Sequence, residues 1–230
     1  MYVLGIETSG PVCSVGLVDE EGVVAERAVR GLRRHSVRLM DLVASVLDDG
    51  GICLADLGML AVGVGPGSFT GLRIGAAVAR TLAQVQGLPA MGIGTLDALA
   101  YPLGRCTGFV GAVVMSRRNE VYMALYRGGE GDAHRLFGPA ALSPDEAAEQ
   151  LAQLEETVIL AGDAAPRYHV AWEAKTKARL VVAPAHLQYP RGAVVAEMAL
   201  ARLGKGEDGG LCCLLPVYVN APAIRSPRRG

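Results

Sequence analysis

A glycine-rich stretch at residues 62–75 (VGVGPGSFTGLRIG) constrains the fold of this chain more than any other. The apolar run 57–64 has the pattern of a buried strand, and residues 72–86 have the pattern of a helix. The stretch is therefore expected to join a strand to a helix, with Ser68 or Thr70 as the helix cap. Glycines in such a turn permit positive φ or close approach of another backbone segment.

The start of the helix after this turn can bind an anion, as glycine-rich loops bind phosphate. The alternative is that the glycines only allow a tight turn and close packing, and the spacing alone favours neither. The stretch lacks the lysine of G-x-x-x-x-G-K-[ST], and its third glycine is misplaced for G-x-G-x-x-G. Together with the polar turn after the first strand, the candidate anion or nucleotide contacts are Glu7, Thr8, Ser9, Gly67, Ser68, Thr70 and Arg73.

Two helices of the N-terminal half carry more apolar surface than one sheet can cover. In the helix expected at 37–49, apolar side chains span roughly 220° of the circumference, whereas packing on one sheet needs little more than about 100°. In the helix at 72–86, small residues recur at every fourth position and would let a second helix approach closely. Burial under another part of the chain and contact with another protein explain this surplus equally well.

The candidate partner-interface residues are Leu39, Met40, Val43, Val46, Leu47, Gly71, Gly75, Val78, Ala79, Leu82 and Ala83. Candidate rim or anion contacts beside them are Arg33, Arg34, Arg73 and Arg80.

The same order of predicted elements occurs twice along the chain. The first set consists of strands at 2–6, 12–19 and 23–29, a helix at 37–49 and a strand at 57–64. The second set consists of strands at 108–115, 119–126 and 134–142, a helix starting at 143–146 and a strand at 157–160. This order predicts an α/β fold with a duplicated β-β-β-α-β architecture and mixed sheets, which resembles the actin-like ATPase (ASKHA) superfamily.

Residues 102–107 are the expected boundary between two subdomains. The N-terminal subdomain, 1–103, carries the interaction helices, and the smaller C-terminal subdomain is 104–230. A helix expected at 192–202 is a candidate to pack back on the first subdomain. A strand at 89–93, a helix from Thr95, its predicted N-cap, to Tyr101, and a short strand at 217–219 complete the predicted elements.

Composition and spacing exclude several classes of function. The formal net charge of −1 gives no overall basic field for nucleic acid. The five cysteines are odd in number and lack C-x-x-C spacing, and the four histidines never stand at ligand spacing, so neither a disulfide framework nor a metal site is expected. No signal peptide or run of 18 apolar residues is present, which predicts a cytoplasmic protein without membrane contact.

Catalytic chemistry finds little support in the residues. In the actin-like plan, the first hairpin holds the phosphates of a nucleotide, and residues 7–9 occupy that place. A polar hairpin with hydroxyl caps is the simpler explanation. No G-x-S-x-G motif is present for a serine nucleophile. We therefore predict no catalytic residues.

Six motifs, spread over nearly the whole chain, resemble the bacterial TsaB family, also called YeaZ. They are Glu7-Thr8-Ser9, Arg34-His35-Ser36, Gly63–Gly75, Thr95–Ala100, Glu120-Val121-Tyr122 and Pro216-Val217-Tyr218. The string GPGSFTGLRIG is highly specific, whereas each of the others alone would be weak. One departure is Met115-Ser116-Arg117, where the family usually has D-A-R, so any role of that aspartate is absent or moved.

The resemblance implies a non-catalytic, TsaD/Kae1-like (glycoprotease M22-like) paralogue. Such a protein is required for transfer of threonylcarbamoyl to N6 of adenosine 37 in tRNAs that read ANN codons. It implies binding to the catalytic subunit TsaD through a four-helix bundle, with TsaE as an ATPase partner and a homodimer when alone. Contact with tRNA would be indirect, no cofactor would bind tightly, and ATP or ADP would lie at the partner junction.

Two alternatives belong to other classes of function. One is an independent actin-like ATPase or phosphotransferase that uses Glu7, Thr8 and Ser9. The lesser alternative is a peptidase, which no motif in the chain supports.

Overall fold

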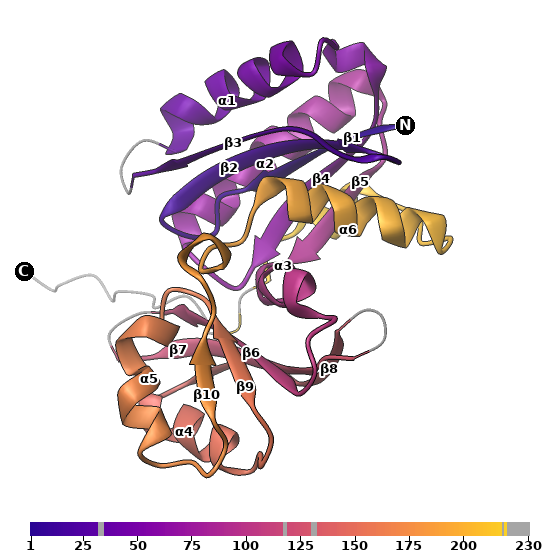
Figure 1. Cartoon of the computed structure of the whole chain (residues 1–230). Helices are drawn as coiled ribbons and strands as arrows, with labels where there is room; N and C mark the ends of the chain where they lie inside the picture. Colours follow the sequence, from indigo (N-terminus) through magenta and orange to yellow (C-terminus); the bar gives the residue numbers. More distant parts are fainter. Residues whose placement is uncertain (32–34, 117–118, 130–132, 218, 220–230) are drawn as a thin grey trace, which may run out of the picture.

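The chain forms two five-stranded sheets, which lie one above the other in Figure 1. The computed structural model describes residues 1–31, 35–116, 119–129, 133–217 and 219. The first sheet consists, in order, of β3 (Gly22–Arg30), β2 (Val12–Asp19), β1 (Tyr2–Glu7), β4 (Leu57–Gly65) and β5 (Ala90–Gly94). The second consists of β10 (Leu180–Val182), β9 (Val158–Ala161), β6 (Phe109–Met115), β7 (Val121–Arg127) and β8 (His134–Leu142).

The two sheets have the same topology. In each, three antiparallel strands are followed by two parallel ones, so the order β3-β2-β1-β4-β5 repeats as β8-β7-β6-β9-β10. This repetition confirms the predicted duplicated plan with mixed sheets. The division of the chain at residue 103 stays a prediction.

Six α-helices and four short 3₁₀ helices connect the strands within the described residues. The α-helices are α1 (His35–Asp49), α2 (Phe69–Gln86), α3 (Thr95–Ala100), α4 (Pro144–Ala152), α5 (Ala165–Glu173) and α6 (Gly192–Gly204). The 3₁₀ helices are η1 (Leu54–Asp56), η2 (Tyr101–Leu103), η3 (Ala185–Leu187) and η4 (Leu211–Leu214).

Several predicted elements differ from the structure. Helix α5 and strand β10 were not predicted, because the stretch 162–182 has a weak apolar pattern. Helix α1 begins at His35 rather than Val37. Thr95 is not the cap of α3, whose cap residue is Gly94. Val217 does not belong to a strand, although its N–H donates to the carbonyl oxygen of Val64 at 2.7 Å.

Helices cover the two faces of the first sheet separately. Helices α1 and α2 pack on one face, where Leu4, Ile6 and Leu60 are buried. Helix α6 packs on the opposite face against Val3 and Met59. Successive side chains of a strand point to opposite faces, so the near-continuous apolar run of β1 follows from burial on both sides.

Helix α6 lies unusually close to β1 and β2 because three facing positions are glycine. A Cβ atom on Gly5 would lie 2.1 Å from the carbonyl oxygen of Gly192, and one on Gly16 would lie 2.2 Å from the nitrogen of Ala193. Both distances are far below van der Waals contact. The sequence at 192–204 therefore packs on the N-terminal sheet, as Figure 1 shows for α6 and the strands above it.

The first turn of α6 is capped by side chains from β2 and β3. Its cap residue, Arg191, makes no side-chain capping bond. Instead, the N–H of Gly192 donates to Ser14 Oγ at 3.0 Å and the N–H of Ala193 donates to Glu26 Oε1 at 3.2 Å. Glu26 also pairs with Arg191. A carboxylate at the start of a helix complements its dipole, which stabilises this docking.

Helix α3 joins the two sheets. Its Leu96, Leu99 and Ala100 share one buried cluster with Val110 and Ala112 of β6 and other residues of the second sheet. Asp97 accepts a hydrogen bond from Tyr126 Oη at 2.8 Å and pairs with Arg135 at 2.6 Å. The contact between the two halves is therefore apolar at its centre and polar at its edge.

Within the described residues, no helix is both long and apolar enough to cross a membrane.

We predict that Gly16→Ala lowers the free energy of unfolding by about 2–3 kcal/mol, because its Cβ would overlap the backbone of α6. Urea denaturation measures this loss. The matched control is Gly10→Ala, whose Cβ would have nothing within 4 Å and which should change stability by no more than about 0.5 kcal/mol. Equal stability of the two variants would contradict the close contact.

Candidate functional site

The turn after β1 packs against the start of α2. Thr8 Oγ1 donates to the carbonyl oxygen of Gly71 at 2.8 Å, and the N–H of Ser68 donates to the carbonyl oxygen of Ser9 at 2.6 Å. A Cβ on Gly71 would lie 2.0 Å from the Thr8 oxygen, and one on Gly67 would lie 2.5 Å from the Ser9 oxygen. The glycines of the turn thus allow two backbone segments to touch. Ser68 caps α2 through its side chain, as predicted.

Glu7 is fully buried behind this contact. Its Oε1 accepts a hydrogen bond from the N–H of Ser9 at 2.5 Å, whereas its Oε2 has no partner among the described residues. Burial removes the carboxylate from water and raises the pKa of Glu7 above its ordinary value. Burial, with the nearby Glu7 charge, also raises the pKa of the Cys13 thiol to about 11.

The turn after β9, which corresponds to the turn after β4 in the first half, is also occupied by the chain itself. The N–H of Gly162 donates to Gln188 Oε1 at 2.9 Å, and the amide nitrogen of Gln188 donates to the carbonyl oxygen of Ala183 at 2.5 Å. Asp163 Oδ1 accepts from the N–H of Met115 at 2.8 Å, and burial raises the pKa of Asp163. These backbone groups are therefore already satisfied. Arg117, of the same motif as Met115, lies outside the described residues.

The residues predicted as nucleotide contacts at the first turn are buried inside the chain, and nucleotide binding there stays a prediction. Glu7, Thr8 and Ser9 are at most 3% exposed, and their bonds are made to α2 or to one another. Gly67 faces Ser9 rather than a ligand. A phosphate could reach these groups only if α2 moved away from the turn, which would break the buried contacts described above.

The exposed part of the predicted anion set lies on the first turn of α2. Ser68 and Thr70 are exposed, and the Arg73 guanidinium lies over the Phe69 ring at 3.9 Å from its centroid. Ser68 already accepts from the N–H of Gly71. Arg80 is exposed farther along α2, whereas Arg33 and Arg34 lie outside the described residues. The described residues contain no group of three His, Cys, Asp or Glu side chains that could hold a metal ion.

Most of the predicted partner interface is used inside the chain. The helix residues that are buried against the first sheet and its neighbours are Leu39, Val43, Val46, Leu47, Gly71, Gly75, Ala79 and Ala83. A Cβ on Gly75 would lie 2.3 Å from Thr8 Oγ1, so the stripe of small residues lets α2 approach β1 and its turn. Contact of this stripe with a partner helix stays a prediction.

A smaller apolar face remains on the outside of α1 and α2, which are in contact with each other. Met40 is 45% exposed, and Val78 and Leu82 are half-buried. The predicted set omitted Ala44 and Val85, of which Val85 is 74% exposed. The helical spacing 78-82-85 could have identified Val85, because those positions lie on one side of a helix. We call Met40, Ala44, Val78, Leu82 and Val85 the outer helix face.

We predict that Glu7→Gln makes the chain more stable than the wild type as the pH rises. Because the folded pKa of Glu7 is raised, its contribution to stability is full below the unfolded pKa of about 4.5 and is lost as the pH rises through the folded pKa. Glutamine stays neutral throughout. Denaturation between about pH 5 and pH 8 should show the two stabilities diverging, whereas the exposed Glu21→Gln should follow the wild type. Parallel profiles for Glu7→Gln and the wild type would contradict this prediction.

Comparisons with known proteins agree on one family. The family model described as "TsaD: tRNA N6-adenosine threonylcarbamoyltransferase" matches residues 17–198. The "tRNA threonylcarbamoyladenosine biosynthesis protein TsaB" of Escherichia coli is 36% identical over 165 residues, which is 70% of this chain and 71% of the relative.

Solved structures give the same result over a longer range. "YeaZ from Pseudomonas aeruginosa" superimposes with a TM-score of 0.80 at 27% identity, over 94% of this chain and 99% of that one. The component A of (R)-2-hydroxyglutaryl-CoA dehydratase from Acidaminococcus fermentans, at a TM-score of 0.52 and 12% identity, shares only the fold; the match covers 89% of this chain and 99% of that one. The architecture is that of the actin-like ATPases. The chain belongs to the TsaB (YeaZ) family.

Proposed function

We propose that this chain is an accessory subunit in the biosynthesis of threonylcarbamoyladenosine at adenosine 37 of tRNA. The observation that carries the proposal is a family relationship to TsaB combined with an outer helix face that the rest of the chain does not cover. In this role the chain binds a TsaD-like catalytic subunit and supports the transfer without performing it.

The outer helix face is the part of the molecule best suited to the catalytic subunit. The face lies on two helices that contact each other, α1 and α2. Its exposed side chains, Met40, Ala44 and Val85, are all apolar. An apolar face on paired helices fits a second pair of helices, because ridges of side chains pack into grooves. The same face would serve a homodimer when the catalytic subunit is absent.

The hydrogen bonds made inside the turns after β1 and β9 support an accessory role over an independent ATPase. An actin-like nucleotide site needs free hydrogen-bond donors at the turns of both halves. Here the Thr8 hydroxyl donates to the carbonyl oxygen of Gly71, and the N–H of Gly162 donates to the side chain of Gln188. The shared cluster around α3 also resists opening of the two halves. The proposal also includes a TsaE-like partner and a cytoplasmic location. Contact with tRNA is indirect, and ATP or ADP binds at the junction with the partner.

We predict that Met40→Asp combined with Val85→Asp weakens binding to the catalytic subunit at least about 30-fold, since truncating interface hot spots costs 2 kcal/mol or more. Calorimetry with the purified catalytic subunit measures this. Stability should change little because both side chains are exposed. The matched control is Val170→Asp on α5, a valine that is 72% exposed in the other half of the chain. Equal binding by the double variant and the control would contradict the assignment.

We predict that omitting this chain from a reconstituted tRNA modification assay abolishes the threonylcarbamoyl product, and that the Met40→Asp/Val85→Asp variant restores little of it. Thr8→Ala should restore the product if the variant folds, because Thr8 contacts α2 rather than a substrate. ATP hydrolysis by the isolated chain that disappears with Thr8→Ala while unfolding stays normal would favour the ATPase alternative. Proteolysis abolished by a single point change would favour a peptidase.

A further inference from the structure

A pocket of about 220 Å³ lies where the end of α6 meets α3, β7 and β8. Met198 and Ala201 of α6 contribute to its lining, as do Tyr126 of β7 and Ala133, the residue before β8. Because α6 covers the first sheet, these lining residues come from both halves of the molecule. A molecule bound in the pocket would therefore touch both halves.

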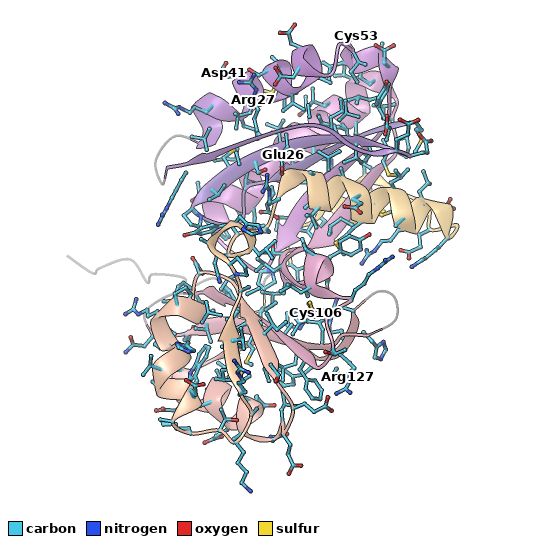
Figure 2. All side chains as sticks on the ribbon, viewed as in Figure 1. Glu26, Arg27, Asp41, Cys53, Cys106 and Arg127 are labelled. Atoms are coloured by element: carbon cyan, nitrogen blue, oxygen red, sulfur yellow. The ribbon has the colours of Figure 1, made fainter. Side chains whose placement is uncertain are left out.

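The pocket is separate from the outer helix face. Helix α6 lies on the face of the first sheet opposite to α1 and α2. In Figure 2, Asp41 is labelled on α1 at the top of the view, and Cys106, in the loop that follows η2, is labelled below α3. This loop reaches the pocket, since a Cβ on Gly104 would lie 2.9 Å from the nitrogen of Ala133. A ligand in the pocket thus leaves the outer helix face free.

The size and lining of the pocket favour a small molecule with one ring. Its volume is below the roughly 300–1,000 Å³ of pockets that hold drug-sized ligands. Two aromatic rings, Tyr101 and Tyr126, line it together with the thioether of Met198 and several alanine side chains. Aromatic rings and thioethers make favourable contacts with the ring of a ligand.

Five of the described lining residues are charged, and two of these form a network that satisfies itself. Asp97 accepts a hydrogen bond from Tyr126 Oη at 2.8 Å and pairs with Arg135 at 2.6 Å. Burial and the neighbouring Asp97 charge raise the pKa of Tyr126, so its hydroxyl keeps the proton for this bond. The charge of Asp97 is therefore balanced by Arg135.

Arg202 is the charged group that this network leaves unpaired. It is half-buried near the end of α6, and among the described residues its guanidinium has no hydrogen bond, ion pair or ring contact. Glu207, the other carboxylate of the lining, is exposed and forms no ion pair within the same part of the chain. Lys205 is exposed and has an interaction of its own. A half-buried guanidinium pairs favourably with a carboxylate, which it binds through two parallel hydrogen bonds.

We propose that this pocket binds a small aromatic carboxylate, with the carboxylate on Arg202 and the ring against Tyr101 and Met198. The ligand then holds α6 of the first half to β7 and β8 of the second. This site is independent of the proposed subunit role, because it lies away from the outer helix face.

The test titrates the full chain with phenylacetate and follows the protein signals by heteronuclear NMR. Phenylacetate should bind with a Kd of about 1 mM or below and shift the signals of the residues that line the pocket. Phenylacetamide, which has the same shape without the charge, should bind at least about tenfold more weakly. Acetate, which lacks the ring, should also bind at least about tenfold more weakly.

Two variants test the pocket itself. Arg202→Gln removes the charge and should weaken phenylacetate binding at least about tenfold while changing phenylacetamide binding little. Ala201→Phe places a ring in the pocket from an exposed position of α6 and should abolish binding. The matched control is Arg80→Gln, an exposed arginine of α2 on the opposite face of the first sheet, which should bind phenylacetate like the wild type. Unfolding curves should show that all three variants fold.

The proposal is overturned if phenylacetate causes no saturable shift, if phenylacetamide binds as tightly, or if Arg202→Gln and Arg80→Gln bind phenylacetate equally. Glu130 and Asp132, which precede Ala133, lie outside the described residues, and Glu130→Gln combined with Asp132→Asn tests them. This double variant should bind phenylacetate like the wild type. Binding that appears only in the double variant would also overturn the proposal, because a carboxylate of the chain itself would then occupy Arg202.

Discussion

The close contact between α6 and the glycines of β1 and β2 determines how the chain is assembled. Residues far along the sequence cover a sheet built from the first hundred residues, and this is possible only because Gly5, Gly16 and Gly192 leave room for backbone to meet backbone. Ser14 and Glu26 then satisfy the N–H groups at the start of the helix. The core of the N-terminal sheet is therefore completed by a helix from the other end of the chain.

A second close contact changes what an actin-like architecture can do. The start of α2 lies on the turn after β1, where Thr8 donates to the carbonyl oxygen of Gly71 and Glu7 is fully buried. In the other half, Gln188 occupies the N–H of Gly162. Polar groups that a nucleotide could use instead form hydrogen bonds within the fold. What the chain still presents to other molecules is surface, above all the outer helix face.

Much of the fold could be predicted from local patterns. The order of elements along the chain and the duplicated plan followed from apolar runs and turns, since these signals depend on neighbouring residues. Helix α5 and strand β10 were missed because their burial comes from contacts with distant residues such as Pro144, which accepts the Trp172 indole N–H. The site was predicted less well. Small residues four apart show that something comes close, but not whether it is a partner's helix or Thr8 of the same chain.

The sequence by itself determined the family, the two repeated units and the need for close packing around the glycine-rich turn, because motifs and periodicity are written in consecutive residues. Only the tertiary structure decided which apolar surfaces are buried inside the chain and which stay exposed. The apolar arc of α1 and the small-residue stripe of α2 meet the sheet, leaving Met40 and Val85 exposed. The physical reason is that a surface is buried only when a second surface covers it, and the covering surface comes from a distant part of the chain.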